Sequence, residues 1–558
     1  MRAIRTGARS RIRARPTSSE RVITDPIRVG ISRGWSVVDV ARLEREQTFE
    51  ADVCIVGTGA GGGVTAEILA RAGLKVLLVE EGPLKSSSDF HMKEADAYPQ
   101  LYQESASRKT RDKAINILQG RCVGGSTTVN WTSSFRTPEA TLRNWRESRG
   151  LATFSPGDLQ PWFEAMETRL SIQPWQFPPN VNNALLARGA QKLGIPSGVI
   201  RRNVKGCWNI GYCGMGCPTN AKQSMLVTTL PSALDAGATL LVNAQAVRLV
   251  AAGETASNGY AALEVAPRFD AGQTASALRC RVHARHFVLA AGAIGTPALL
   301  LRSASPDPHG VLGRRTFLHP TIISAALMAD PVNAHAGAPQ TIFSDHFLDS
   351  VPIEGPLGFK LEAPPLHPVV FATTMAGYGE QHAALMREFT RTHVLLALLR
   401  DGFHPDSHGG RVQLRDDGSP VLDYPLDATL FDGVRRAYLA MAEIQFAAGA
   451  KSVLPVHEQA LPYTSWPQAR QAIAELSLKP LSTRIVSAHV MGGCAMSMDA
   501  KGGVVNPDGR HHQLGNVSVF DGSIFPTSIG ANPQLSIYAI VARMATKLAG
   551  ELGGKPAG

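Results

Sequence analysis

The chain has 558 residues, of which 44% are hydrophobic and 18% charged, a composition typical of a globular protein and unlike a disordered or collagen-like chain. Its length predicts two or three lobes, because a single hydrophobic core rarely organises so long a chain. The net charge is +10, but the first fifteen residues alone contain six arginines and no acidic residue. The remaining excess is small and gives no indication of nucleic-acid binding.

Residues 1–48 are expected to form a basic, flexible N-terminal arm. The alternatives are a transit peptide and a start codon assigned too far upstream. The arm lacks the apolar segment of a secretory signal. The sequence also contains no run of eighteen or more apolar residues, so no transmembrane segment is predicted. A cytoplasmic location is expected, with peripheral membrane association or export with an accessory subunit as alternatives.

The first predicted unit is a strand, a helix and a second strand over residues 51–80. Gly57, Gly59 and Gly62 form the pattern G-x-G-x-x-G between the first strand and the helix. These glycines permit a tight turn, close approach of a diphosphate and close helix–strand packing. The diphosphate would lie at the helix N-terminus, and Glu80 at the end of the second strand would accept both hydroxyls of an adenosine ribose. The pattern predicts dinucleotide binding and leaves NAD and FAD open.

Further segments combine glycines with polar residues. In the segment 119–130, Gly124 and Gly125 would bring backbone without side chains close to a planar ring system. The segment 292–297 follows an apolar strand at 287–291, so its loop is expected at the carboxyl edge of a sheet, where cofactors bind. The other segments are Leu318-His319-Pro320, His489 to Cys494, Asp521 to Pro526 and Asn532-Pro533.

Taken together, these segments resemble the signature regions of the glucose-methanol-choline (GMC) oxidoreductases, in the same order and over residues 51–545. The resemblance implies that the cofactor is FAD and not NAD. It also places Gly125, Asn130 and Asp521 near the flavin. The fold class it implies is α/β, with a Rossmann-type FAD-binding domain interleaved with an α+β substrate domain built on an antiparallel sheet. The expected ranges are 49–150, 200–330 and 481–558 for the FAD-binding domain, and 151–199 and 331–480 for the substrate domain.

Local patterns support this view of the substrate domain. Residues 410–424 alternate apolar and polar side chains around Asp416-Asp417-Gly418-Ser419 and predict a β-hairpin. Residues 432–448 have apolar side chains at three- and four-residue spacing and predict an amphipathic helix. The range 331–480 is therefore expected to form an antiparallel sheet with helices.

Oxidation of an alcohol needs a base that removes the hydroxyl proton while hydride leaves the carbon. Histidine suits this step near neutral pH, and His489 stands where the family carries its catalytic histidine. Asn532 stands where family members carry His or Asn, and its amide can donate a hydrogen bond to a developing alkoxide. The plainer alternatives are a buried structural histidine and a turn residue before Pro533. His319 is assigned a structural role.

Val129 bears on how the flavin is held. Family members that bind FAD covalently do so through a histidine placed just before the position of Asn130. This chain has valine there, which cannot form that bond, so dissociable, non-covalent FAD is expected.

Three of the seven cysteines, Cys207, Cys213 and Cys217, lie within eleven residues at C-x5-C-x3-C spacing. The segment resembles that of long-chain alcohol oxidases, which have a fourth cysteine where Ile210 stands here. It also resembles that of bacterial sugar dehydrogenases, in which three cysteines hold a [3Fe-4S] cluster. Thiolates suit iron–sulfur clusters, whereas a structural zinc site needs a fourth ligand. Ordinary free thiols are the first expectation, because three ligands are marginal and Ile210 breaks the four-cysteine pattern. A [3Fe-4S] cluster is the alternative, and it would imply an electron-acceptor protein as partner.

The sequence therefore predicts an FAD-dependent enzyme that oxidises a small-molecule alcohol to an aldehyde or ketone. The alternatives are a flavoprotein without redox turnover, similar to the hydroxynitrile lyases, and an electron-transfer catalytic subunit with a [3Fe-4S] relay. The alcohol is left open between sterols, long-chain alcohols and terpenoids, because specificity depends on the shape of a pocket.

Overall fold

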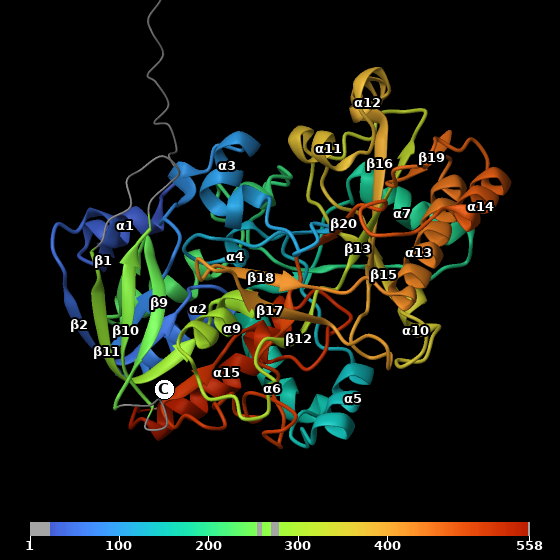
Figure 1. The fold of residues 1–558 in the computed structure, drawn as a ribbon. Helices are drawn as coiled ribbons and strands as arrows, with labels where there is room; N and C mark the ends of the chain where they lie inside the picture. Colours follow the sequence, from blue (N-terminus) through green and yellow to red (C-terminus); the bar gives the residue numbers. More distant parts are fainter. Residues whose placement is uncertain (1–22, 254–258, 269–277, 556–558) are drawn as a thin grey trace, which may run out of the picture.

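The computed structural model describes residues 23–253, 259–268 and 278–555. The arginine-rich start of the predicted N-terminal arm lies outside these residues. Two sheets dominate the molecule and stand side by side, with the C-terminal helix beneath the first of them (Figure 1).

The first sheet is the nucleotide-binding sheet that the 51–80 pattern predicts. β2 and β3 are parallel and are joined through α2. The strand order is β1-β8-β3-β2-β11-β10-β9, with β22 paired to β11. All its pairs are parallel except β11–β10 and β10–β9. Its strands are β1 (Ser36–Asp39), β2 (Thr48–Val56), β3 (Val76–Val79), β8 (Thr239–Val242), β9 (Ala244–Ala251), β10 (Tyr260–Pro267), β11 (Cys280–Leu289) and β22 (Val517–Val519).

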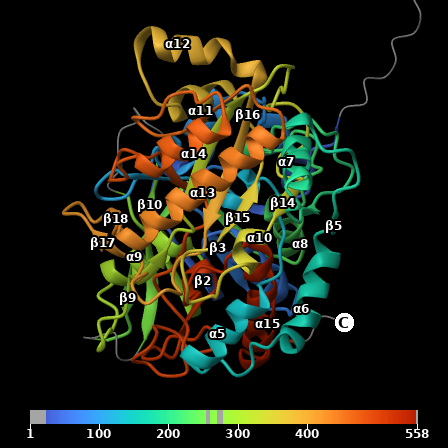
Figure 2. The same cartoon turned by 90° about the vertical axis from the view of Figure 1, so that its right-hand side faces the viewer.

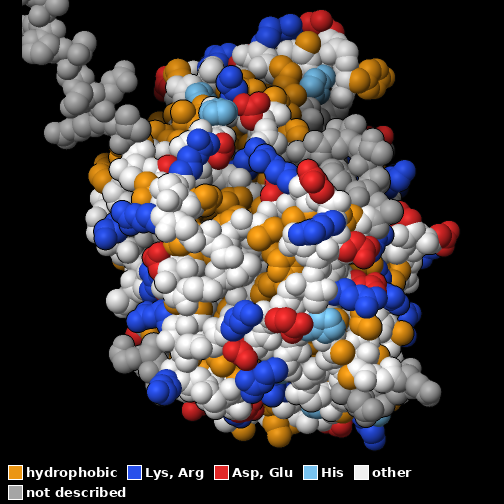
Figure 3. Space-filling view, turned by 90° about the vertical axis from the view of Figure 1, so that its left-hand side faces the viewer, with side chains coloured by type: hydrophobic (Ala, Val, Ile, Leu, Met, Phe, Trp, Pro, Cys, Tyr) orange, Lys and Arg blue, Asp and Glu red, His pale blue; other side chains and the backbone are white. Residues whose placement is uncertain are grey.

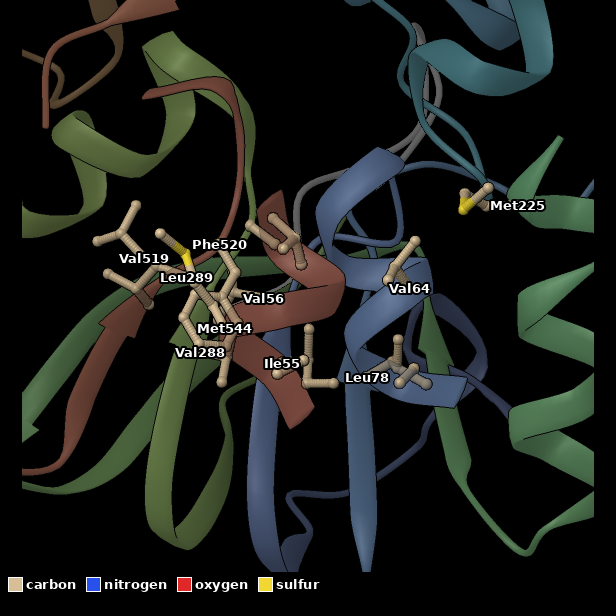
Figure 4. Close-up of a cluster of buried hydrophobic side chains, with 14 of the residues drawn as sticks. Ile55, Val56, Val64, Leu78, Met225, Val288, Leu289, Val519, Phe520 and Met544 are labelled. Carbon is tan, nitrogen blue, oxygen red and sulfur yellow. The ribbon is translucent and has the colours of Figure 1, made fainter. Parts of the chain in front are cut away.

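Apolar side chains from distant parts of the chain form the core beneath this sheet. Figure 4 shows Ile55, Leu78 and Val288 of the strands together with Val64 of α2 and Met544 of α15. The helices of this part are α2 (Ala60–Arg71), α8 (Thr229–Asp235), α9 (Gly292–Arg302) and α15 (Gln534–Glu551). β3 and the C-terminal halves of β2 and β11 are buried, which explains the continuous apolar runs there.

The N-terminal arm differs from the prediction between residues 26 and 39. These residues form α1 (Pro26–Ser32) and β1, which extends the first sheet by pairing with β8. The Asp25 side chain caps α1 by accepting hydrogen bonds from the backbone N–H groups of Ile27 and Arg28. This segment is therefore part of the folded domain and not of a flexible arm.

The second sheet is mostly antiparallel and has the order β4-β20-β13-β16-β15-β14-β6, with β19 paired to β13. Only the β4–β20 pair is parallel. Its strands are β4 (Ile115–Ile117), β6 (Gly198–Val199), β13 (Thr321–Leu327), β14 (Ile342–Ser344), β15 (Phe359–Glu362), β16 (Thr392–Leu399), β19 (Ser452–Pro455) and β20 (Ile485–Ser487). Strands from both predicted domain ranges thus share this sheet.

Helix α13 (Ala428–Ala447) crosses the second sheet on the side turned toward the viewer in Figure 2. It confirms the predicted amphipathic helix but begins four residues earlier, because Asp427 caps it through the Leu430 N–H at 2.8 Å. The other helices around this sheet are α7 (Val181–Lys192), α10 (His346–Asp349), α11 (Pro368–Thr374), α12 (Gly379–Arg387) and α14 (Trp466–Glu475).

A small third sheet connects the two parts in the order β18-β17-β12-β21. β17 and β18 are antiparallel and confirm the predicted hairpin at 410–424. Its strands are β12 (Arg314–Phe317), β17 (Gly410–Leu414), β18 (Pro420–Asp423) and β21 (Met491–Gly492). The remaining elements are α3 (Glu94–Leu101), α4 (Ser126–Val129), α5 (Glu139–Arg149), α6 (Pro156–Arg169), β5 (Ile172–Pro174), β7 (Arg201–Asn203), and short 3₁₀ turns that include Cys213–Met215 and Gly522–Ile524.

The surface over the first sheet has mixed charge, with Lys and Arg side chains interspersed among Asp and Glu (Figure 3). Among the described residues, the longest helices remain too short or too polar to cross a membrane. The architecture confirms the predicted α/β class, with a Rossmann-type sheet beside an antiparallel one.

Candidate active site

The turn between β2 and α2 has the geometry that its glycines predict. Gly57 has φ +99°, a conformation that side chains other than glycine rarely adopt. A Cβ on Gly57 would collide with the backbone of Ala290, and one on Gly62 would collide with the carbonyl of Gly57. These two glycines therefore let the turn, α2 and β11 approach one another closely.

Gly59 differs from its neighbours because it faces open space. A Cβ placed on it would meet only the Cα of Gly125, at 3.9 Å. Gly59 is also the N-cap of α2 and provides no side-chain cap, so the first N–H groups of the helix remain available to a ligand. Gly125, with φ +53°, comes from the second glycine loop. A side-chain-free space in front of a helix N-terminus fits the diphosphate of FAD.

Glu80 lies directly after β3 and is only 6% exposed. Its carboxylate accepts hydrogen bonds from the N–H and hydroxyl of Thr58, at 3.1 and 2.5 Å, and from the N–H of Gly82 at 2.9 Å. Burial raises its pKa. The Thr58 hydroxyl also accepts from the N–H of Gly124 at 2.9 Å. Thr58 thus links the Glu80 carboxylate to the second glycine loop, a contact that the motif did not reveal.

Asp521 connects β22 to the start of α9. Its carboxylate accepts hydrogen bonds from the N–H of Gly292 at 2.8 Å, the hydroxyl of Thr296 at 2.6 Å and the N–H of Ser523 at 2.8 Å. The preceding carbonyl, of Phe520, lies so close to Gly61 that a Cβ there would collide with it. The segment around Phe520 and Asp521 therefore lies against the N-terminus of α2.

Asn130 lies at the end of α4 and joins the second glycine loop to the C-terminal helix. Its amide donates to the side-chain oxygen of Gln534 at 2.7 Å. Its carbonyl accepts from the buried ammonium of Lys222, which also donates to the carbonyls of Thr128 and Cys213, at 2.9, 2.6 and 2.7 Å respectively. Burial lowers the pKa of Lys222 to about 8. Neither Lys222 nor Gln534 was predicted, because a lone polar residue carries no spacing pattern.

The predicted base, His489, is partly buried and follows β20. Its Nδ1 lies 3.1 Å from Nδ1 of His319, which is fully buried. Burial lowers the pKa of His489 to about 4, so the ring is neutral at neutral pH. In the described structure Nε2 of His489 has no protein hydrogen-bond partner, which leaves this nitrogen for a substrate.

Asn532 is 4% exposed and belongs to a buried polar network. Its amide donates to Glu362 of β15 at 3.3 Å, and the same carboxylate oxygen accepts from Gln340 at 2.5 Å. The Gln340 carbonyl accepts from the Ser133 hydroxyl at 2.8 Å. Asn532 Oδ1 and Glu362 Oε1 are buried without a partner among the described residues. Burial raises the pKa of Glu362 to about 7.

Sequence reasoning missed Glu362, because β15 alternates apolar and charged residues and resembles a strand with one face in solvent. Its position next to Asn532 depends on the pairing of β15 with β14 and β16. All four residues of β15 are buried in the structure, and a buried acid needs partners.

The structure does not support the [3Fe-4S] alternative for the three cysteines. Each sulfur accepts a separate hydrogen bond: Cys207 from the Asn209 N–H at 3.4 Å, Cys213 from Arg202 at 3.6 Å and Cys217 from the Lys222 N–H at 3.5 Å. Across the described ranges, no three His, Cys, Asp or Glu side chains are grouped so that they could hold a metal ion. All three are free thiols in the structure.

The Rossmann-type sheet, the paired glycine loops and the buried carboxylate after β3 are typical of a dinucleotide-binding protein. The family model described as GMC oxidoreductase matches residues 98–321 with its N-terminal part and residues 405–541 with its C-terminal part. The chain therefore belongs to the GMC oxidoreductase family. It is an FAD-dependent oxidoreductase that acts on CH–OH groups.

Relatives extend over most of the chain. A GMC-type oxidoreductase of Mycobacterium tuberculosis is 32% identical over 92% of this chain and 80% of its own length. The long-chain-alcohol oxidase FAO4A of Arabidopsis thaliana is 28% identical over 88% of this chain and 67% of its own. Pyridoxine 4-oxidase from Mesorbium loti shares the fold with a TM-score of 0.66 at 20% identity, covering 89% of this chain and 99% of that one.

Proposed function

We propose that the protein oxidises an alcohol to the aldehyde or ketone, with His489 as the base and Asn532 as the hydrogen-bond donor to the substrate oxygen. The observation that carries this proposal is the His489 ring, which is neutral, is fixed through Nδ1 and has no partner at Nε2 among the described residues. FAD, when bound, supplies the hydride acceptor. The chain's own part is to hold the alcohol and to take its hydroxyl proton at Nε2 of His489.

Asn532 would donate a hydrogen bond to the same oxygen. Its amide nitrogen carries two hydrogens, and Glu362 accepts one of them. The second hydrogen remains for the alkoxide that develops as the proton leaves. Glu362 and Gln340 thereby orient the amide before the substrate arrives.

Conversion of Glu362 to glutamine tests this orientation. We expect Glu362→Gln to slow flavin reduction by about two- to tenfold, the effect of one lost hydrogen bond worth about 0.5–1.5 kcal/mol. Since the ionised carboxylate is the acceptor and its pKa is about 7, the wild-type rate should rise modestly as the pH increases through 7. Stopped-flow pH profiles should show this step in the wild type and not in the variant. Identical profiles would remove Glu362 from the mechanism.

We infer that FAD is bound without a covalent link, because Val129 stands at the position where a histidine would form one. Heat or acid precipitation is expected to release all of the FAD into the supernatant. Absorption of the supernatant and pellet measures this directly. A precipitate that keeps its flavin colour would contradict the inference.

The decisive experiment is an anaerobic visible spectrum of the FAD-loaded protein, recorded with a panel of long-chain, sterol, terpenoid and sugar alcohols. Bleaching of the flavin by one class identifies the substrate, and the similarity to a long-chain-alcohol oxidase makes that class the first to test. Flavin that is never reduced by an alcohol, although it is reduced by dithionite, would favour a non-redox flavoprotein instead.

A further inference from the structure

His319 is held in an unusual conformation beside the predicted base. It lies between β12 and β13 with φ +49°, in the left-handed region that only a few per cent of residues other than glycine occupy. The carboxylate of Asp401 accepts the N–H groups of both Leu318 and His319, at 3.0 and 3.1 Å. The Tyr424 hydroxyl donates to the same carboxylate at 2.7 Å. Buried contacts therefore stabilise a backbone conformation that is costly by itself.

A second set of contacts fixes the two histidines relative to each other. The Ser487 hydroxyl donates to the carbonyl of Leu318 and accepts from the N–H of His489 at 3.3 Å. The two imidazole rings have centroids 5.3 Å apart and planes inclined by 31°. The 3.1 Å contact between their Nδ1 atoms is thus imposed by the backbone on both sides.

A contact between two Nδ1 atoms contains a single proton, and its position decides whether His489 can act. If His319 carries the proton, neutral His489 must carry its own proton on Nε2 and cannot accept another there. If His489 carries it, the Nε2 lone pair is free. Burial, together with the nearby Lys360 and Arg400, disfavours positive charge on His319, so its ring holds a single proton. When Nδ1 of His319 accepts, that proton is on Nε2, which is buried without a partner among the described residues.

We infer that His319 is the positioning residue of the active site: it accepts the hydrogen bond from Nδ1–H of His489 and so holds the tautomer whose Nε2 can take the substrate proton. When that proton moves from the hydroxyl oxygen to Nε2, His489 becomes an imidazolium, and His319 continues to accept from its Nδ1–H. The inference rests on the proposed role of His489 as base. It assigns a function to a histidine that the motif suggested was only structural.

The tautomer can be observed without turnover. In FAD-loaded protein labelled with ¹⁵N-histidine, with His489 assigned by comparison with His489→Gln, we expect His489 to be protonated on Nδ1 and unprotonated on Nε2 at pH 7. The complementary form, with the proton of His489 on Nε2, would overturn the inference whatever the enzyme's substrate proves to be.

Two variants of His319 distinguish the loss of the hydrogen-bond acceptor from the loss of the imidazole ring. Asn adopts positive φ readily, and its Oδ1 occupies the place of Nδ1, so His319→Asn is expected to stay within about fivefold of the wild-type rate of flavin reduction. His319→Leu fills the same space without an acceptor and should lose at least about tenfold, with an unchanged dissociation constant for the alcohol. Equal rates in His319→Leu and the wild type would overturn the inference.

His393 is a matched control. It is fully buried in β16, its Nδ1 contacts Asn182 at 2.8 Å, and its Nε2 also has no partner in the described structure. His393→Leu should lower the melting temperature comparably and leave flavin reduction intact. If His319→Leu does not bind FAD, the NMR measurement on the wild type decides. If no alcohol reduces wild-type flavin, the proposed function fails, while the tautomer is still measured.

Discussion

His489→Gln is expected to slow flavin reduction by alcohol by about 10²- to 10⁴-fold, the contribution of a positioned general base. Glutamine fills a similar volume but cannot accept a proton at the position of Nε2. FAD content and melting temperature should remain close to those of the wild type, since His489 is partly exposed and its ring makes one hydrogen bond. Anaerobic stopped-flow absorbance with the alcohol found by the panel measures the rate constant.

The pH dependence provides an independent check of the same residue. The base must be neutral to accept a proton, and burial lowers the pKa of His489 to about 4. The rate should therefore fall steeply only as the pH drops through about 4, below the modest step expected from Glu362.

His286→Gln is the control for His489→Gln, because His286 is a buried histidine of the first sheet that contacts Ser518 at 3.0 Å. An equal loss of rate in His489→Gln and His286→Gln would show a general effect of destabilisation.

Gly59→Ala is expected to weaken FAD binding by roughly ten- to a hundredfold, which corresponds to an overpacking cost of about 1–3 kcal/mol. In the protein without FAD the added methyl group has room, since its nearest neighbour would be the Cα of Gly125 at 3.9 Å. The apoprotein should therefore fold with an unchanged melting temperature. The loss appears only on titration with FAD, because the methyl group occupies the space that the diphosphate needs.

Gly157→Ala is the matched control for this substitution. Gly157 lies in the first turn of α6, and its added Cβ would meet only the Ser155 hydroxyl oxygen, at 3.8 Å. This variant should bind FAD like the wild type. Equal affinity of Gly59→Ala and the wild type would place the diphosphate elsewhere, and a lower melting temperature of the Gly59→Ala apoprotein would contradict the open space at Gly59.

Local patterns predicted several elements correctly because short-range physics determines them. The 51–80 unit, the 410–424 hairpin and the helix around 432–448 depend on side-chain periodicity and turn residues within a few positions. The N-terminal helix and strand were missed, since β1 is stabilised by pairing with β8, about 200 residues away. Such pairing leaves no signal in the segment itself.

For the candidate site, too, spacing alone predicted some features correctly and others wrongly. Gly57 and Gly62 were identified by spacing, and the structure brings both into the contacts that only glycine permits. The cysteine segment had suggestive spacing as well, yet each thiol has its own hydrogen-bond partner. Spacing predicts a metal site only when the fold also turns the side chains toward one point.

The sequence by itself determined the nucleotide-binding unit, the family resemblance and the type of residue available for catalysis, because glycine patterns and apolar periodicity encode local backbone geometry. Only the tertiary structure decided that His319 contacts His489, that Glu362 accepts a hydrogen bond from Asn532 and that Lys222 donates to the carbonyl of Asn130. These partners are 170, 170 and 92 residues apart in the chain. Contacts between such distant residues depend on how the sheets assemble, which no local pattern specifies.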